Sequence, residues 1–203
     1  LETIGTAPIT ASLLRCPQFG AFRYVHEVLK QVALLLQTSD QILAERDWEG
    51  RVGNQCFDET STHIQLTRRW IPHVAHRFYA TDAAPRVLLF VSVLVDDRHN
   101  EYEPMDECLL TAGAIVCKDT GWDDQWKLWW GRWHGFQRPR HDDGRIIVSE
   151  SKDWGEQSED GALIERVITK GVPLPTVRST DDLKTFLRSE EHTSELQSRQ
   201  CIS

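Results

Sequence analysis

Two acidic residues and a lysine in the C-terminal half have the types and spacing needed for chemistry on a phosphate. Glu150 and Lys152 follow a short apolar run, and on a strand they would point to the same side. An upstream acid is available at Asp143, or at Asp123 or Asp124. Paired carboxylates bind Mg²⁺, and a cation stabilises negative charge that develops on a phosphate oxygen. The set therefore predicts a site for a divalent metal such as Mg²⁺.

This pattern resembles the Asp…Glu-x-Lys motif of the restriction-endonuclease-like nucleases. The resemblance implies that Asp143 and Glu150 hold the metal and that Lys152 polarises the scissile phosphate of a nucleic acid. It covers about a third of the chain, and its core, Glu-x-Lys, is a pattern of only three residues that many charged proteins contain. The competing interpretation is an exposed Glu/Lys pair at the end of a strand.

A run of tryptophans is the most distinctive feature of the sequence. Trp122, Trp126, Trp129, Trp130 and Trp133 recur at a spacing that places them on one face of a helix. Tryptophan contributes much of the binding energy in protein interfaces, and its N–H gives one directed hydrogen bond. We therefore expect Trp126, Trp129, Trp130 and Trp133 to form a binding surface. The alternative is that these rings close the core.

The secondary structure of the Trp segment has two interpretations. Thr120 and Asp123 have the spacing of a capping box, which favours a helix. Alternatively, residues 127–136 pair with residues 145–153 as a hairpin. The helix is preferred, and the hairpin stays open.

A third group joins arginines and histidines in the sequence RRWIPHVAHRF. Arg68 and Arg69 precede His73 and His76 at spacings that resemble the catalytic motif of the HEPN ribonucleases. The resemblance implies that Arg and His act on the 2′-hydroxyl and the phosphate of RNA. Two other interpretations are a metal site completed by His63 or a nearby acid, and ordinary surface histidines on a helix.

Hydrophobic periodicity and capping signals predict the helices that would position these residues. Four segments have such a pattern: residues 22–36, with a restart after Thr38; residues 64–78, interrupted at Pro72; residues 158–171, with Gly171 as the C-terminal cap; and a last helix capped by Ser179 and Asp182.

The clearest strand is residues 86–95, which are apolar at almost every position. Such a run predicts a strand buried on both faces, and therefore one in the middle of a sheet with Phe90 in the core. Residues 111–119 and 145–151 are further strands. The expected fold is α+β, a single domain with N-terminal helices, a small mixed sheet around 86–95, and C-terminal helices.

The two ends of the chain suggest a fragment. The sequence begins at Leu1 rather than at Met, and the last predicted helix runs directly into residues 188–203. Within these, RSEEHTSELQS resembles the translation of a sequencing adapter. We therefore expect one α+β domain over residues 1–187, truncated at both ends, and an artefactual tail over 188–203.

Composition excludes several classes of protein. The chain has 203 residues, 40% of them hydrophobic, which predicts a folded and soluble domain. A net charge of −8 argues against a nucleic-acid module driven by bulk charge. No apolar run reaches the roughly 20 residues that cross a bilayer. The five cysteines have no metal-binding spacing, which indicates reduced thiols in the cytoplasm.

These observations favour a non-catalytic, cytoplasmic binding or protein-interaction domain. Its contact segment is the Trp-rich stretch 122–133, its partner a protein or a small apolar ligand, and it needs no cofactor and no membrane. The alternative is the metal-dependent nuclease, with Asp143, Glu150 and Lys152 acting on nucleic acid. Whether the protein is an enzyme stays open.

Overall fold

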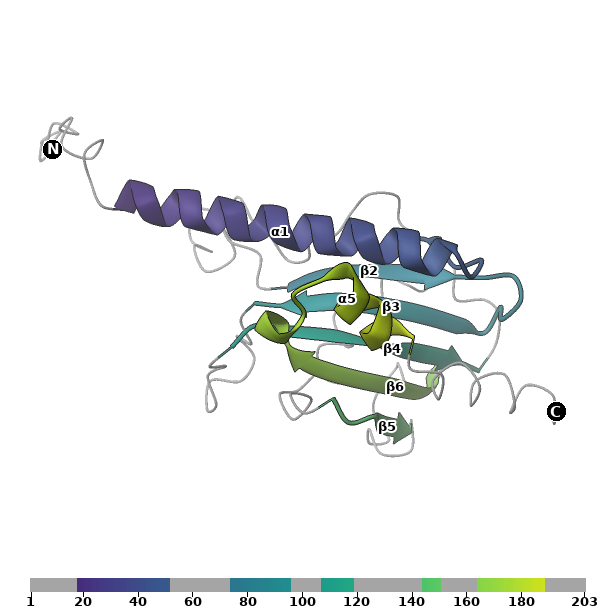
Figure 1. Cartoon of the computed structure of the whole chain (residues 1–203). Helices are drawn as coiled ribbons and strands as arrows, with labels where there is room; N and C mark the ends of the chain where they lie inside the picture. The colour runs from purple at the N-terminus through teal and green to yellow at the C-terminus, as the bar shows by residue number, and fades with distance from the viewer. Residues whose placement is uncertain (1–17, 52–73, 96–106, 119–143, 151–163, 189–203) are drawn as a thin grey trace, which may run out of the picture.

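The computed structural model of the protein describes residues 18–51, 74–95, 107–118, 144–150 and 164–188. Two α-helices lie on one face of a six-stranded sheet, one before it in the chain and one after it (Figure 1). This arrangement confirms the predicted α+β class. The elements are α1 (Gln18–Ala44), β1 (Glu49–Gly50), β2 (Val74–Ala80), β3 (Val87–Leu94), β4 (Leu109–Cys117), β5 (Ile147–Glu150), β6 (Ile164–Pro173), the 3₁₀-helix η5 (Leu174–Thr176) and α5 (Thr180–Leu187).

The strands follow one another in the order β1-β2-β3-β4-β6-β5. Each of the five pairings is antiparallel, so the sheet is not the mixed one that the sequence suggested. The apolar run 86–95 forms β3, which lies in the interior of the sheet between β2 and β4. Phe90 is 1% exposed, as expected for a strand covered on both faces.

Helix α1 is one continuous helix of 27 residues, without the restart predicted at Thr38. The Thr38 hydroxyl donates to the carbonyl oxygen of Leu34 at 2.8 Å, and the Ser39 hydroxyl donates to that of Leu35 at 3.0 Å. Both hydroxyls are thus used inside the helix rather than as caps. Within the described residues, neither helix has the length and apolar character needed to cross a membrane.

The helix predicted over 64–78 is wrong for its described part, because residues 74–80 form β2. All seven residues of β2 are buried, so the strand shows no alternation of apolar and polar positions. The spacing of Val74, Ala75 and Phe78 then imitates a helical face.

The helix predicted over 158–171 is also wrong in its described part, where Ile164–Pro173 form β6. The register between β4 and β6 shifts at Val116/Cys117, where β6 contributes one extra residue. This shift places Ile164 and Val167, three residues apart, in the same core cluster on one face of the sheet. Their spacing therefore reflects a bulged strand and not a turn of helix.

The last helix, α5, begins where the capping signal predicts. The Ser179 hydroxyl accepts a hydrogen bond from the backbone N–H of Asp182 at 3.1 Å. Asp182 in turn accepts from the backbone N–H of Arg178, which lowers the pKa of this carboxyl. Leu183 and Phe186 face the sheet from α5. The predicted boundary at 187/188 and the tail 188–203 are not tested, because residues 189–203 lie outside the described part.

The core has two layers, one on each face of the sheet. On the helical face, Val32, Leu36 and Ile42 of α1 pack with the buried residues of α5 and with alternate residues of the strands. On the other face, Phe78 and Phe90 are members of a second buried cluster. The helical face is the one that carries a cavity lined by residues of α1, α5 and the sheet.

Candidate functional site: a cavity under the two helices

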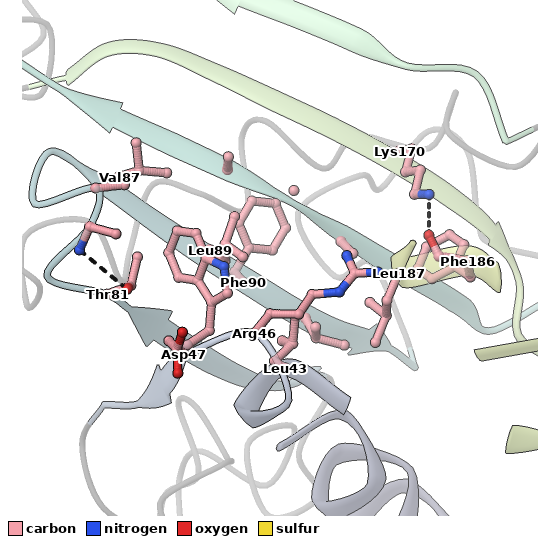
Figure 2. Close-up of a pocket in the computed structure, with 17 residues that line it drawn as sticks. Leu43, Arg46, Asp47, Thr81, Val87, Leu89, Phe90, Lys170, Phe186 and Leu187 are labelled. Carbon is pink, nitrogen blue, oxygen red and sulfur yellow. Dashed lines mark hydrogen bonds between the residues drawn. The ribbon is translucent and has the colours of Figure 1, made fainter. Parts of the chain in front are cut away.

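A cavity of about 260 Å³ lies between the C-terminal end of α1, helix α5 and the sheet (Figure 2). Its volume is slightly below the range for pockets that hold drug-sized molecules, which begins at roughly 300 Å³, so its ligand must be small. Its lining is mostly apolar, and its polar side chains are those of Arg46, Asp47, Thr81 and Lys170.

Small residues on β4 create the space at the floor of the cavity. Ala112 lies opposite Val91 of β3, and Ala114 lies opposite Leu89. All four side chains belong to the helical face of the sheet. Because the methyl groups of the two alanines are short, the floor is lower here than under the neighbouring β3 side chains. The alternation of large and small side chains on β3 and β4 therefore shapes the cavity.

The backbone at Gly113 is covered from the opposite face by a ring. A Cβ atom at Gly113 would lie 2.8 Å from Phe90 Cζ and would also clash with the backbone oxygen of Ile168. The Phe90 ring thus fills the space that a side chain at position 113 would need. Gly113 and Phe90 together close the floor between Ala112 and Ala114.

The turn after α1 supplies one wall. Asp47 adopts a positive φ of 61°, and the backbone N–H of Trp48 donates to the carbonyl oxygen of Leu43 at 3.2 Å. This left-handed turn reverses the chain within three residues of the helix end. It brings the Trp48 ring, which is buried, against the cavity beside Leu43.

A buried lysine provides the most unusual polar group of the cavity. Lys170 on β6 is only 6% exposed and lies opposite Ala112 in the register. Its Nζ donates to the backbone oxygen of Phe186 and lies 4.5 Å from the centre of the Phe186 ring. That oxygen belongs to the last turn of α5, where carbonyls have no partner within the helix. Burial lowers the pKa of Lys170 to about 8.

Two more charged side chains lie at the rim. Arg46 is exposed, and its guanidinium extends toward Leu187, whereas Asp47 lies at the end away from Lys170 (Figure 2). The hydroxyl of Thr81, near Asp47, accepts from the backbone N–H of Ala83 at 3.4 Å. The cavity therefore has an apolar body with a cationic end at Lys170 and Arg46.

An ion pair fixes α1 on the sheet near this site. Arg77 of β2 donates to Asp40 through Nε at 3.1 Å and through Nη2 at 3.0 Å. Tyr79 is fully buried beside them, and this burial, with the nearby Asp40 carboxylate, raises the pKa of its hydroxyl well above the usual value. Gly50 of β1 leaves room for the guanidinium, since a Cβ there would lie 2.7 Å from Arg77 Nη2.

A second hollow is an open groove of about 520 Å³ on the other side of α5. It runs between α1 and the segment that leads into α5, and Leu34, which is 47% exposed, lies along it. Among its described lining residues Arg178 is the only charged one. The groove lacks the enclosed apolar floor and the buried cation of the first cavity.

The residues predicted from the sequence fall largely outside the described part of the chain. This applies to the whole segment 122–133, with Trp126, Trp129, Trp130 and Trp133, and to Asp143 and Lys152. Glu150 is described: it ends β5, is exposed, and lies opposite Arg166 of β6. Whether Asp143, Glu150 and Lys152 converge is therefore not tested.

The histidine motif is described only at its end. His76 is buried in β2, and its ring meets that of Phe78 edge-on at 5.0 Å. The helix on which His73 and His76 would share a face is therefore not formed at residues 74–80. His63, Arg68, Arg69 and His73 lie outside the described residues. Within the described ranges, no three His, Cys, Asp or Glu side chains are placed to hold a metal ion.

Sequence reasoning missed the cavity and its two cations. One signal was present for Lys170: it is a single charge inside the apolar stretch VITKGV, where a strand would bury it. The spacing of the apolar residues predicts a helix here, and a helix does not require Lys170 to be buried. Arg46 and Trp48 carried no signal, because their positions depend on where α1 ends and on the turn at Asp47.

The chain was compared with protein-family models, with curated proteins and with solved structures, and none of them matches it.

Proposed function

We propose that this protein is a non-catalytic binding domain that holds a small, mainly apolar ligand in the cavity under α1 and α5. The observation that carries the proposal is the mostly apolar cavity with its floor of Ala112 and Ala114. Apolar cavities bordered by a few polar groups are the usual form of small-molecule sites. The proposal keeps the sequence-based expectation of a binding domain and puts its site among the described residues; the contact segment expected at 122–133 stays a prediction, because it lies outside them.

A cavity-filling substitution tests the proposal. Ala112→Leu should fill part of the cavity, because Ala112 lines its floor next to Val91 on the neighbouring strand β3. The probe is octan-1-ol, a small uncharged amphiphile, titrated while the methyl NMR signals of Leu43, Val87 and Leu89 are followed. In the wild-type protein these signals should shift and saturate.

The variant should bind octan-1-ol at least about tenfold more weakly, since about 1.4 kcal/mol of lost contact corresponds to a factor of ten. Its thermal unfolding temperature should be equal or higher, because added methyl groups occupy empty space. The matched control is Ala21→Leu at an exposed site in the first turns of α1. Equal affinity for octan-1-ol in Ala112→Leu and the control would contradict the proposal.

A further inference from the structure

The polar groups of the cavity indicate the chemical class of its ligand. Lys170 and Arg46 border the cavity from different segments, β6 and the turn after α1, and both lie toward its α5 end (Figure 2). The remaining wall on that side is the aliphatic side chain of Leu187 and the ring of Phe186. A ligand that fits this end must offer negative charge next to apolar surface.

The position of Lys170 Nζ is set by the protein itself. The Phe186 backbone oxygen accepts from it, and the Phe186 ring lies 4.5 Å away, so the ammonium group is held at the junction of α5 and the cavity. An ammonium group has three donors, and a carboxylate can accept from more than one cation. A carboxylate that reaches this ammonium group would add a charge-assisted hydrogen bond, which is stronger than one between neutral groups.

Arg46 can complete the recognition of a carboxylate. Its guanidinium is planar and presents paired donors that match the two oxygens of a carboxylate. Arg46 is exposed, whereas Lys170 is buried. Asp47 disfavours an anion at the opposite end of the cavity. The charges therefore give the ligand one orientation.

From this juxtaposition we infer that the ligand is an amphiphilic monoanion with a single carboxylate, such as a medium-chain fatty acid. Its carboxylate binds between Lys170 Nζ and Arg46, and its hydrocarbon chain lies over Ala112, Ala114 and Leu89. This inference rests on the proposed function, since it needs the cavity to accept an apolar body.

The test compares three probes of equal chain length: octanoate, octan-1-ol and octylammonium. At about pH 7 octanoate should bind about tenfold more tightly than octan-1-ol, because charge-assisted hydrogen bonds are the stronger ones. Octylammonium should bind most weakly. The affinity for octanoate should also fall as the pH rises through about 8, where Lys170 loses its proton, while the affinity for octan-1-ol stays constant.

Lys170→Met removes the charge and keeps an apolar side chain of similar length. It should weaken octanoate binding at least about tenfold and change octan-1-ol binding by less than about threefold. The matched control is Lys184→Met on α5, since Lys184 does not line the cavity. Arg46→Gln, at an exposed position, provides a second variant that does not depend on the folding of the buried site.

The outcomes separate the two proposals. Equal binding of octanoate and octan-1-ol, or no loss of octanoate binding in both Lys170→Met and Arg46→Gln, would overturn the carboxylate inference and leave the apolar site standing. No binding of any of the three probes to the wild-type protein would overturn the proposed function and this inference with it.

Discussion

Arg77 reaches from β2 to α1 and is 8% exposed, while its partner Asp40 is 36% exposed. Asp40→Asn removes the negative charge and leaves the guanidinium in a mostly buried position. We expect the free energy of unfolding to fall by about 2 to 3 kcal/mol, as for the loss of hydrogen bonds to a buried charged group. Urea unfolding followed by far-UV circular dichroism measures this loss.

The surface pair between Arg86 and Glu165 is the natural control. The Arg86 guanidinium lies 2.7 Å from Glu165, but the two side chains are 37% and 46% exposed. Glu165→Gln should cost less than about 1 kcal/mol, because water and salt screen an exposed pair. Equal losses in Asp40→Asn and Glu165→Gln would show that burial of Arg77 has no special effect.

Lys170 should give the protein a distinctive response to alkaline pH. Burial lowers its pKa from 10.5 to about 8 in the folded state. Between about pH 8 and pH 10.5 the unfolded chain binds more protons than the folded one, so this group makes the free energy of unfolding rise with pH. Lys170→Met lacks this contribution.

The measurement is urea unfolding of the wild type and Lys170→Met at about pH 7.5, 9 and 10.5. The stability of the wild type should increase relative to that of the variant across this series. Subtracting the two curves removes the titration of the tyrosines and cysteines, which both proteins share. A difference that stays constant with pH would mean that Lys170 is not desolvated.

At the scale of elements, β3 and β4 are interior strands of the sheet and are packed tightly against each other. Phe90 of β3 is buried against Gly113 of β4, where no other side chain fits. Phe90→Ala leaves a hole over the glycine that the backbone cannot fill. We expect a loss of about 3 to 5 kcal/mol in the free energy of unfolding.

Val148 offers a comparison on the edge strand β5. It is 50% exposed, so Val148→Ala should change the stability by no more than about 0.5 kcal/mol. Thermal unfolding of the two variants side by side measures the contrast. If Phe90→Ala is as stable as Val148→Ala, β3 is not the central strand of the core.

The elements differ in how well the sequence predicts their secondary structure. β3 was predicted because eight consecutive positions are apolar or small, and α5 because Ser179 and Asp182 form a local cap. The sequences of β2 and β6 predict helices, because burial on both faces, and in β6 a bulge, removes the period of two that is typical of a strand. Local signals were sufficient where they were strong, and tertiary burial overrode them elsewhere.

The candidate site could not be predicted from local sequence signals. Its cavity depends on the crossing of α1 and α5 over one face of the sheet and on the positive φ at Asp47. Neither is encoded in a spacing of residues. Lys170 was the one member that an apolar context could have marked, had β6 been assigned as a strand.

At the scale of the whole molecule, a chain with a net negative charge contains a cavity bordered by two cations, Lys170 and Arg46. The chain has a net charge of −8, so long-range attraction does not steer an anion toward it. Selectivity for a carboxylate must then come from close contact with Lys170 and Arg46. We therefore expect the affinity for octanoate to depend only weakly on ionic strength, unlike binding to an exposed basic patch.

The helices and the sheet together border the ligand site. α1 and α5 lie over the same face of the sheet (Figure 1), and the cavity is lined by residues from the end of α1, from the turn that leads toward β1, and from α5. The ion pair between Asp40 and Arg77 anchors α1 a few residues before this turn. A ligand in the cavity thus contacts α1, α5 and the sheet, which are already held together by contacts that do not involve the ligand.

The central claim is that an apolar ligand occupies this cavity, and the most direct measurement is the location of bound octan-1-ol by intermolecular NOEs. We predict NOEs from its methylene protons to the methyl groups of Leu43, Val87 and Leu89, which line the cavity. NOEs confined to Leu34 and Val177, in the open groove, or the absence of NOEs to any described methyl group would contradict the claim.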